Sequence, residues 1–242
     1  MNNNRKNEPA LLSEDELMKV ENNMTVDDYL AQLHADFDPV YSMLMNYQCA
    51  AEAVETKVNI LNNRLSLQGE HNPIESIKSR VKSLDSIIHK LDKHGFPIEI
   101  ESVEKLIDVA GVRIICSFVD DIYKIEECLL AQEDVKLIMR NDYIQNPKPS
   151  GYRSLHLVIE TPIYTENGKK DMKVEIQLRT MAMDFWASLS HKLRYKKNLD
   201  PKIADELSAE LEACAKVSAE LDGKMLQIRD RISNNTTAAS ES

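Results

Sequence analysis

Apolar residues recur every three or four positions along the first quarter of the chain, which is the spacing of amphipathic helices. The pattern predicts a short helix over 25–33. Asp38 and Pro39 predict the start of a longer helix that runs to about residue 67 and is closed by Gly69. Its apolar seam consists of Leu44, Tyr47, Ala51, Val54, Val58, Leu61 and Leu65. Packing on its own domain is the favoured explanation of this seam, and a subunit interface is the alternative.

A third helix is predicted from Pro73 to His94, where Gly95 would end it. From about Ile107 the residues become β-branched and apolar ("VAGVRIICSFV"), which is typical of a buried strand. The stretch "TENGKK" contains the Asn-Gly pair of a hairpin turn. The pattern further predicts a helix over 120–132, strands near 135–143, 152–161 and 172–179, and helices over 180–197 and 201–232.

Together these elements predict an α/β protein of the mixed α+β kind, in which helices flank a mixed sheet of about five strands. Helical extensions precede and follow the sheet. The Asn-rich start and the polar end, "SNNTTAASES", are expected to be disordered. We therefore expect a flexible start, a main domain, a C-terminal helix and a disordered tail, over 1–24, 25–200, 201–232 and 233–242.

Composition narrows the class of protein. A formal net charge of −10 argues against a general binder of nucleic acids, whose surface is normally basic, and RNA binding is not indicated. No apolar run approaches the roughly 18 residues of a membrane span, and the first residues lack the apolar core of a signal peptide. The four cysteines form no C-x-x-C pair. We expect a cytoplasmic protein without a membrane partner.

Two neighbouring strands each present a row of polar side chains. Strand parity places Glu175, Gln177 and Arg179 of "KVEIQLRT" on the face opposite its apolar residues. By the same rule Tyr152 and His156 of "GYRSLHLVIE" share a face. Such a row is either a solvent-facing surface or a ligand site. The ring, the imidazole and the preceding glycine favour a site in which the tyrosine stacks on a nucleobase.

A basic stretch and two acids could serve phosphate chemistry. The segment "SIKSRVKSLDSIIHKLDK" carries five Lys or Arg and two Asp, hence 5 − 2 = +3. Lys82, Ser86 and Lys90 recur every four residues, so on one helix they would line a face that holds a polyphosphate or is merely solvated. No Walker A loop occurs. Asp108 and Glu175 could hold Mg²⁺ and activate a hydroxyl.

Four segments in order carry a resemblance: "SRVKSLDSIIHK", "DVAGVRIICSFVDDI", "SGYRSLHLVIE" and "VEIQLRTMAMDFWASLSHKLRYK". Over about residues 73–197 the chain resembles the synthetase domain of RelA/SpoT-type (p)ppGpp synthetases, and its length resembles the small alarmone synthetases. The resemblance implies a nucleotidyltransferase-like fold. It also implies transfer of the β,γ-pyrophosphate of ATP to the 3′-hydroxyl of GDP or GTP, leaving AMP.

The resemblance assigns roles to individual residues. It implies that Asp108 and Glu175 are the catalytic residues and hold Mg²⁺, with Glu175 activating the 3′-hydroxyl. Residues that would bind ATP are Arg80, Lys82, Ser86, Lys90 and Arg113. Residues that would bind GTP or GDP are Tyr152, His156, Gln177, Arg179, His191 and Lys196.

The resemblance also sets limits and alternatives. Ser190 stands where related synthetases often have Glu before the histidine, so a role for that acid is not expected here. No His-Asp dipeptide occurs, so the hydrolase module of long family members is not expected. Small members form homotetramers, which implies the same for this chain. The alternatives are a toxin-like pyrophosphokinase that acts on adenosine nucleotides or tRNA, and a non-catalytic nucleotide- or RNA-binding module.

Overall fold

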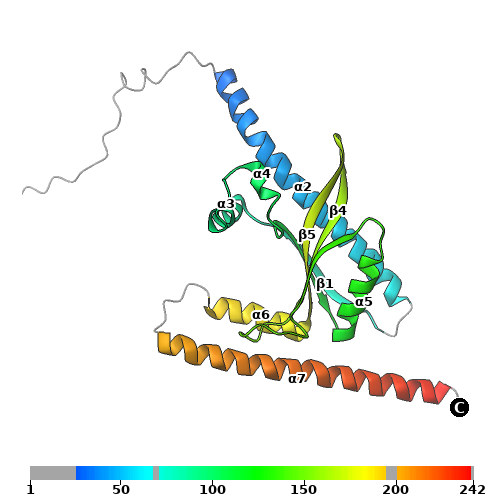
Figure 1. The fold of residues 1–242 in the computed structure, drawn as a ribbon. Helices are drawn as coiled ribbons and strands as arrows, with labels where there is room; N and C mark the ends of the chain where they lie inside the picture. Colours follow the sequence, from blue (N-terminus) through cyan, green and yellow to red (C-terminus); the bar gives the residue numbers. More distant parts are fainter. Residues whose placement is uncertain (1–25, 68–70, 195–200, 241–242) are drawn as a thin grey trace, which may run out of the picture. The chain divides into compact units, whose positions relative to one another are not determined.

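The computed structural model describes residues 26–67, 71–194 and 201–240. The chain forms two compact units, Met1–Ser42 and Met43–Ser242. The sheet belongs to the second unit (Figure 1). Among the described residues no helix is long and apolar enough to span a bilayer. The predicted disorder of 1–24 lies outside the described residues.

The second unit is built on one mixed sheet of five strands in the order β1-β2-β5-β4-β3. Only β2 and β5 run parallel, and the other neighbours are antiparallel. The strands are β1 (Ile74–Val81), β2 (Ala110–Cys116), β3 (Lys136–Asp142), β4 (Leu155–Thr165) and β5 (Gly168–Thr180). The predicted mixed sheet flanked by helices is confirmed, and so is the hairpin, in which Thr165 pairs with Gly168.

The first strand corrects the sequence prediction. A helix was expected from Pro73 to His94, but its first half is β1, which pairs antiparallel with β2. Only α3 (Leu84–Lys93) is helical, beginning after the cap Ser83. The sequence of β1 suits either state, and pairing with β2 supplies the backbone partners that decide it. The predicted end at Gly95 is confirmed, since this glycine has a φ of 68°.

The apolar face of the sheet is covered by helices. Val174, Ile176 and Leu178 of β5 are fully buried there, as strand parity predicted. The short helix α4 (Ile100–Val103) precedes β2, and α5 (Val119–Leu130) packs on β2 and β5. The other face of β5, which carries Glu175 and Gln177, is therefore the polar face.

The sequence predicted two helices in this region, but the structure has one long helix, α2 (Val26–Ser66). Pro39 lies inside it, where the missing N–H of proline leaves one helical hydrogen bond unmade. In the second unit the seam residues Tyr47, Val54 and Val58 are buried. The hydroxyl of Tyr47 donates to the carbonyl of Val103 (3.5 Å), so the seam packs on its own domain.

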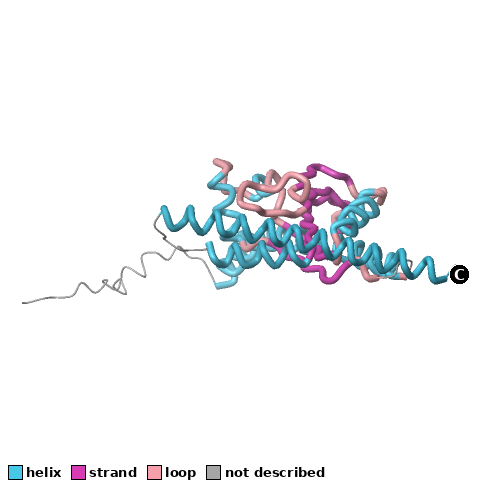
Figure 2. Tube along the Cα trace, turned by 90° about the horizontal axis from the view of Figure 1, so that it is seen from below, coloured by secondary structure: helices cyan, strands magenta, loops and turns pink. Residues whose placement is uncertain are grey.

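Two helices follow the sheet, α6 (Met181–Arg194) and α7 (Pro201–Ser240). They pack together, and α7 runs past the strands, as Figure 1 and Figure 2 show. Trp186 of α6 donates to the carbonyl of Leu211 (2.8 Å), and Ser218 donates to that of Ala182 (3.1 Å). The helix α7 continues past residue 232, where a disordered tail was predicted, because residues 233–240 contain no proline or glycine to stop it.

Candidate active site

The register of the sheet gathers the predicted residues on its polar face. Arg113 of β2, Gln177 of β5 and His156 of β4 are consecutive partners across three strands. The neighbouring row joins Arg80 of β1, through Gly111, to Glu175. Side chains from four strands therefore meet on one face, although they are up to about 100 positions apart in the sequence.

A closed set of hydrogen bonds links five side chains on this face. Arg179 Nη2 donates to the Tyr152 hydroxyl (2.7 Å) and to Gln177 Oε1 (2.9 Å). Gln177 Nε2 donates to Glu175 Oε2 (2.9 Å). The Tyr152 hydroxyl lies 2.7 Å from His156 Nε2, and His156 Nδ1 lies 3.3 Å from Glu175 Oε1. Gln177 and His156 therefore hold the carboxylate of Glu175 from two sides.

Glu175 is poised to be ionised. Burial alone would raise the pKa of its carboxyl group. The hydrogen bond and charge of His156, together with the hydrogen bond from Gln177, outweigh burial and lower the pKa. The negative charge of Asp108 raises it again by a smaller amount. A carboxylate that stays charged at neutral pH can accept a proton or ligate a cation.

Asp108 forms the second acidic centre, between two lysines. Lys90 of α3 hydrogen-bonds to its Oδ2, and Lys82 Nζ lies 3.3 Å from the same oxygen. Burial would raise the pKa of Asp108, but the hydrogen bond from Lys90 and the charges of Lys82 and Lys90 outweigh it and lower the pKa. Lys82 precedes α3, so the predicted helical ladder of Lys82, Ser86 and Lys90 is wrong in its geometry, although both lysines reach one carboxylate.

The donor set fits a magnesium ion. Asp108 Oδ1 is buried and has no hydrogen-bond partner, while Oδ2 is taken by the lysines. Glu175 is close enough for its charge to interact with that of Asp108. Mg²⁺ commonly takes one or two protein carboxylates and completes its shell with substrate phosphates and water. Within the described part of the chain, no cluster of three or more His, Cys, Asp or Glu could hold a metal by itself.

Three arginines on the polar face lie close enough for their charges to interact. Arg80 is exposed, Arg113 is partly buried and Arg179 is buried. Burial lowers the pKa of Arg113, and the positive charges of Arg179 and Arg80 lower it further, while Asp184 opposes them. The Nε atoms of Arg113 and Arg179 are buried without a partner. Crowded planar cations of this kind suit a polyanionic or aromatic ligand.

The remaining predicted residues lie further out. Ser86 is exposed in the first turn of α3, where its hydroxyl lies 2.9 Å from that of Ser83. His191 lies exposed on α6. Lys196 falls outside the described residues. The structure thus gathers most of the predicted set and leaves Ser86 at the edge.

The loop before β4 holds Tyr152 in place. Gly151 has a φ of 86°, and a Cβ at this position would lie only 2.5 Å from the Cβ of Ala215 in α7. The glycine before the ring therefore allows the close backbone approach that the sequence suggested. Sequence reasoning missed Tyr143 and Lys148: the Tyr143 ring meets that of Tyr152 edge-on, and the Lys148 ammonium lies over both. Neither residue belongs to a sequence motif or a periodic pattern that would have singled it out.

Comparisons with known proteins agree with this geometry. A family model described as a region found in RelA / SpoT proteins matches residues 79–200. GTP pyrophosphokinase YwaC of Bacillus subtilis is 47% identical over 190 residues, which cover 78% of this chain and 90% of that protein. GTP pyrophosphokinase YjbM of the same organism is 37% identical over 81% of this chain and 92% of its own length.

Solved structures point the same way. The crystal structure of small alarmone synthetase 1 from Bacillus subtilis bound to its product pppGpp matches with a TM-score of 0.73 and 35% identity, covering 81% of this chain and 99% of that chain. Small alarmone synthetase 2 from the same organism matches with a TM-score of 0.70 and 47% identity, covering 78% and 97%. The family-model match and the identity to these relatives show that the chain belongs to the RelA/SpoT family.

Proposed function

We propose that this protein is a (p)ppGpp synthetase, a GTP pyrophosphokinase that transfers the β,γ-pyrophosphate of ATP to the 3′-hydroxyl of GDP or GTP. The observation that carries this proposal is the meeting of two electrostatically coupled carboxylates, Asp108 and Glu175, with the lysines and arginines of the polar face. The relatives named as GTP pyrophosphokinases support it.

The transfer is an in-line displacement at the β-phosphorus. The 3′-oxygen of the acceptor forms a bond to Pβ, the bond between Pβ and the oxygen bridging to Pα breaks, and AMP leaves with that oxygen. Glu175 accepts the proton of the 3′-hydroxyl, and His156 and Gln177 hold its carboxylate for that step. Magnesium, held by Asp108 and Glu175, would offset phosphate charge when bound.

The two nucleotides would occupy opposite ends of the face. For ATP, Arg80 and Arg113 would provide planar guanidinium groups for adenine, and Lys82, Ser86 and Lys90 would lie toward the phosphates. For the guanine nucleotide, we infer stacking on Tyr152 and contacts from His156, Gln177 and Arg179, with His191 and Lys196 at the rim. These substrates and Mg²⁺ are cytoplasmic, and so is the proposed site of action.

The test is a panel of acceptors. Purified protein is incubated with ATP and Mg²⁺ together with GDP, GTP, AMP or tRNA, and the products are separated by anion exchange. Formation of AMP together with a pyrophosphorylated guanine nucleotide is the expected result. Labelling of tRNA or AMP alone would reject the guanine acceptor, and binding without any turnover would reject the enzyme.

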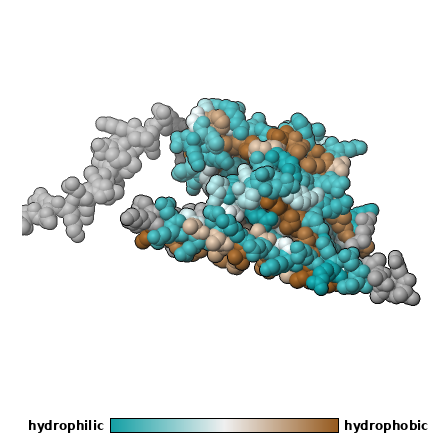
Figure 3. All heavy atoms as spheres, turned by 60° about the horizontal axis from the view of Figure 1, so that its bottom comes forward, coloured by the Kyte–Doolittle hydropathy of each residue, from teal (hydrophilic) through white to brown (hydrophobic). Residues whose placement is uncertain are grey.

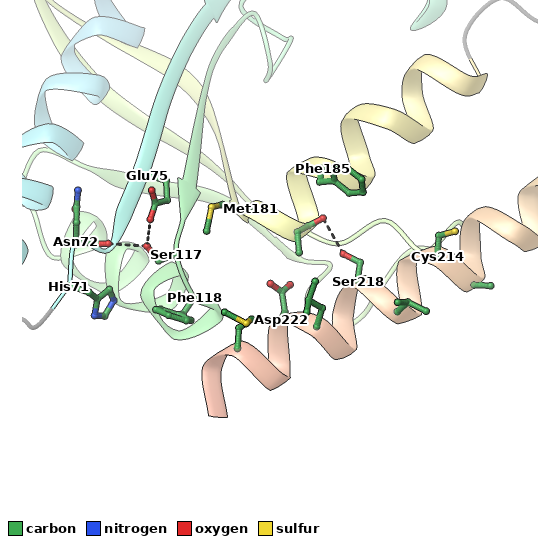
Figure 4. A pocket seen from close by; sticks show the side chains of 15 residues that line it. His71, Asn72, Glu75, Ser117, Phe118, Met181, Phe185, Cys214, Ser218 and Asp222 are labelled. Carbon is green, nitrogen blue, oxygen red and sulfur yellow. Dashed lines mark hydrogen bonds between the residues drawn. The ribbon is translucent and has the colours of Figure 1, made fainter. Parts of the chain in front are cut away.

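We also propose that the protein is a homotetramer. On α7 a stripe of exposed apolar side chains recurs at mostly three- or four-residue spacing, visible in Figure 3: Ile203, Leu207, Val217, Leu221, Met225, Ile228 and Ile232. It borders a groove of about 1020 Å³ between α6, α7 and the start of β1, which Phe185 and Met181 also line (Figure 4). Helix pairing between subunits would cover such a stripe.

Multi-angle light scattering tests the assembly. The change Leu221→Lys places a charge on the stripe and should lower the molar mass to that of a smaller assembly. Gln227→Lys adds the same charge at another exposed position of α7 and should leave the mass unchanged. An unchanged mass for Leu221→Lys would remove this stripe from the interface.

A further inference from the structure

Asp184, in the first turn of α6, has the geometry of a bridge between two arginines. Its Oδ1 accepts a hydrogen bond from Arg179 Nη1 at 2.9 Å and lies 3.6 Å from Arg113 Nη1. One carboxylate oxygen therefore faces two guanidinium groups. The local sequence gives no indication of the contact between Asp184 and Arg113, because Arg113 lies 71 positions before Asp184 (184 − 113).

The two arginines need a shared anion. The side chain of Arg179 is only 6% exposed, and a buried cation is unfavourable unless it is paired. The charges of Arg113 and Arg179 disfavour one another, and Arg80 adds a third positive charge nearby. Asp184 is the carboxylate that pairs with both Arg113 and Arg179 among the described residues. Without its charge the repulsion between the two guanidinium groups would be left uncompensated.

Each arginine faces a different part of the site. Arg179 donates to the hydroxyl of Tyr152 and to Gln177, which both belong to the hydrogen-bonded set around Glu175. Arg113 lies on the next strand, where it pairs with Gln177 on one side and Lys78 on the other. A displacement of Asp184 would therefore disturb the ATP end and the guanine end of the face together.

We propose that Asp184 is a positioning residue that sets the places of Arg113 and Arg179 and so shapes the binding sites of both nucleotides at once. The inference rests on the proposed function for the identity of the two ligands. Its specific content is that one substitution, at a residue that touches neither nucleotide, weakens the binding of each of them.

The experiment compares Asp184→Asn, which keeps the shape and removes the charge, with Asp184→Glu, which keeps the charge. Asp205→Asn, at an exposed position of α7, controls for the loss of one negative charge. Calorimetry measures the binding of GDP and of an ATP analogue with a methylene group between Pα and Pβ, each alone, and steady-state kinetics give kcat and both KM values. Melting temperatures are recorded for all variants.

Asp184→Asn should weaken the binding of both ligands and raise both KM values about tenfold, since the ion pairs of the carboxylate with Arg113 and Arg179 are lost. Asp184→Glu should recover part of this loss, and Asp205→Asn should behave as the unchanged protein. Weakening of only one ligand, stronger binding of both, or a lower melting temperature with unchanged KM values would overturn the inference. Failure of the unchanged protein to bind either ligand would instead reject the proposed function.

Discussion

The two ends of the polar face are built in different ways. At the guanine end, Tyr152, His156 and Gln177 hydrogen-bond to one another or to Glu175 in a closed set. At the ATP end, Arg80 and Ser86 are exposed, and Lys82 and Lys90 share the carboxylate of Asp108. On the proposed function, this difference means that the acceptor end is preorganised for the step in which a proton moves, whereas the cations of the ATP end would be ordered by the phosphates when ATP binds.

The largest effect is expected where the two ends meet. Glu175→Gln keeps the size of the side chain and removes the base, so kcat should fall by about 10³-fold. Binding of both nucleotides, measured by calorimetry, should persist within a few fold. Turnover close to that of the unchanged protein would remove Glu175 from the proton transfer, and with it the idea that the acceptor end is preorganised for that step.

The support beneath Tyr152 can be tested through Gly151. Gly151→Ala combines a positive φ with a contact of 2.5 Å to Ala215, and it should lower the free energy of unfolding by about 2–4 kcal/mol. Gly95→Ala is the matched control, because Gly95 has a φ of 68° but nothing within 4 Å of an added Cβ. Urea unfolding should show a larger loss for Gly151→Ala, and equal losses would mean that α7 does not support the loop.

The hydroxyl of Tyr152 can be separated from its ring. Tyr152→Phe removes the link between Arg179 and His156 while keeping the ring, so KM for GDP should rise by about three- to tenfold and KM for ATP should hardly change. Tyr152→Ala should raise KM for GDP further. A matching rise in KM for ATP would show that the two ends are not independent at this residue.

The ion pairs of Asp108 at the ATP end should make the stability of the protein depend on pH. Because the pKa of Asp108 is lowered in the folded protein, its ion pairs stabilise the fold above the ordinary Asp pKa of about 3.9. That stabilisation disappears as the pH falls through the lower folded-state value. Asp108→Asn should therefore melt at a lower temperature than the unchanged protein at pH 7. The difference should shrink as the medium is acidified below about pH 4, and a constant difference would contradict the assignment.

The smallest effect is expected at the edge of the site. Ser86 is exposed and hydrogen-bonds with the cap residue Ser83, so Ser86→Ala should raise KM for ATP by less than about threefold. Initial rates at varied ATP would measure it. A tenfold or larger rise would place Ser86 among the principal phosphate contacts and contradict its place at the edge of the site.

Strand periodicity was a reliable guide in the sheet centre and failed at its edge. The β5 residues Val174, Ile176 and Leu178 form a strict alternation with the polar row, and burial of one face forces that register. Residues 74–81 carry no such alternation and precede a true helix, so the prediction extended that helix backward over β1. For an edge strand such as β1, pairing with the neighbouring strand, and not the local sequence pattern, determines the secondary structure.

What the amino-acid sequence determined by itself is chemistry that repeats locally: the alternating faces of β4 and β5, the hairpin, the end of α3 at Gly95, and four motifs whose order marks the family. The tertiary structure decided which distant charges share a partner. Lys82 and Lys90 meet Asp108, and Arg113 and Arg179 meet Asp184, because strand register and helix packing bring them together. Coulomb interactions depend on distance in space, and sequence separation does not encode that distance.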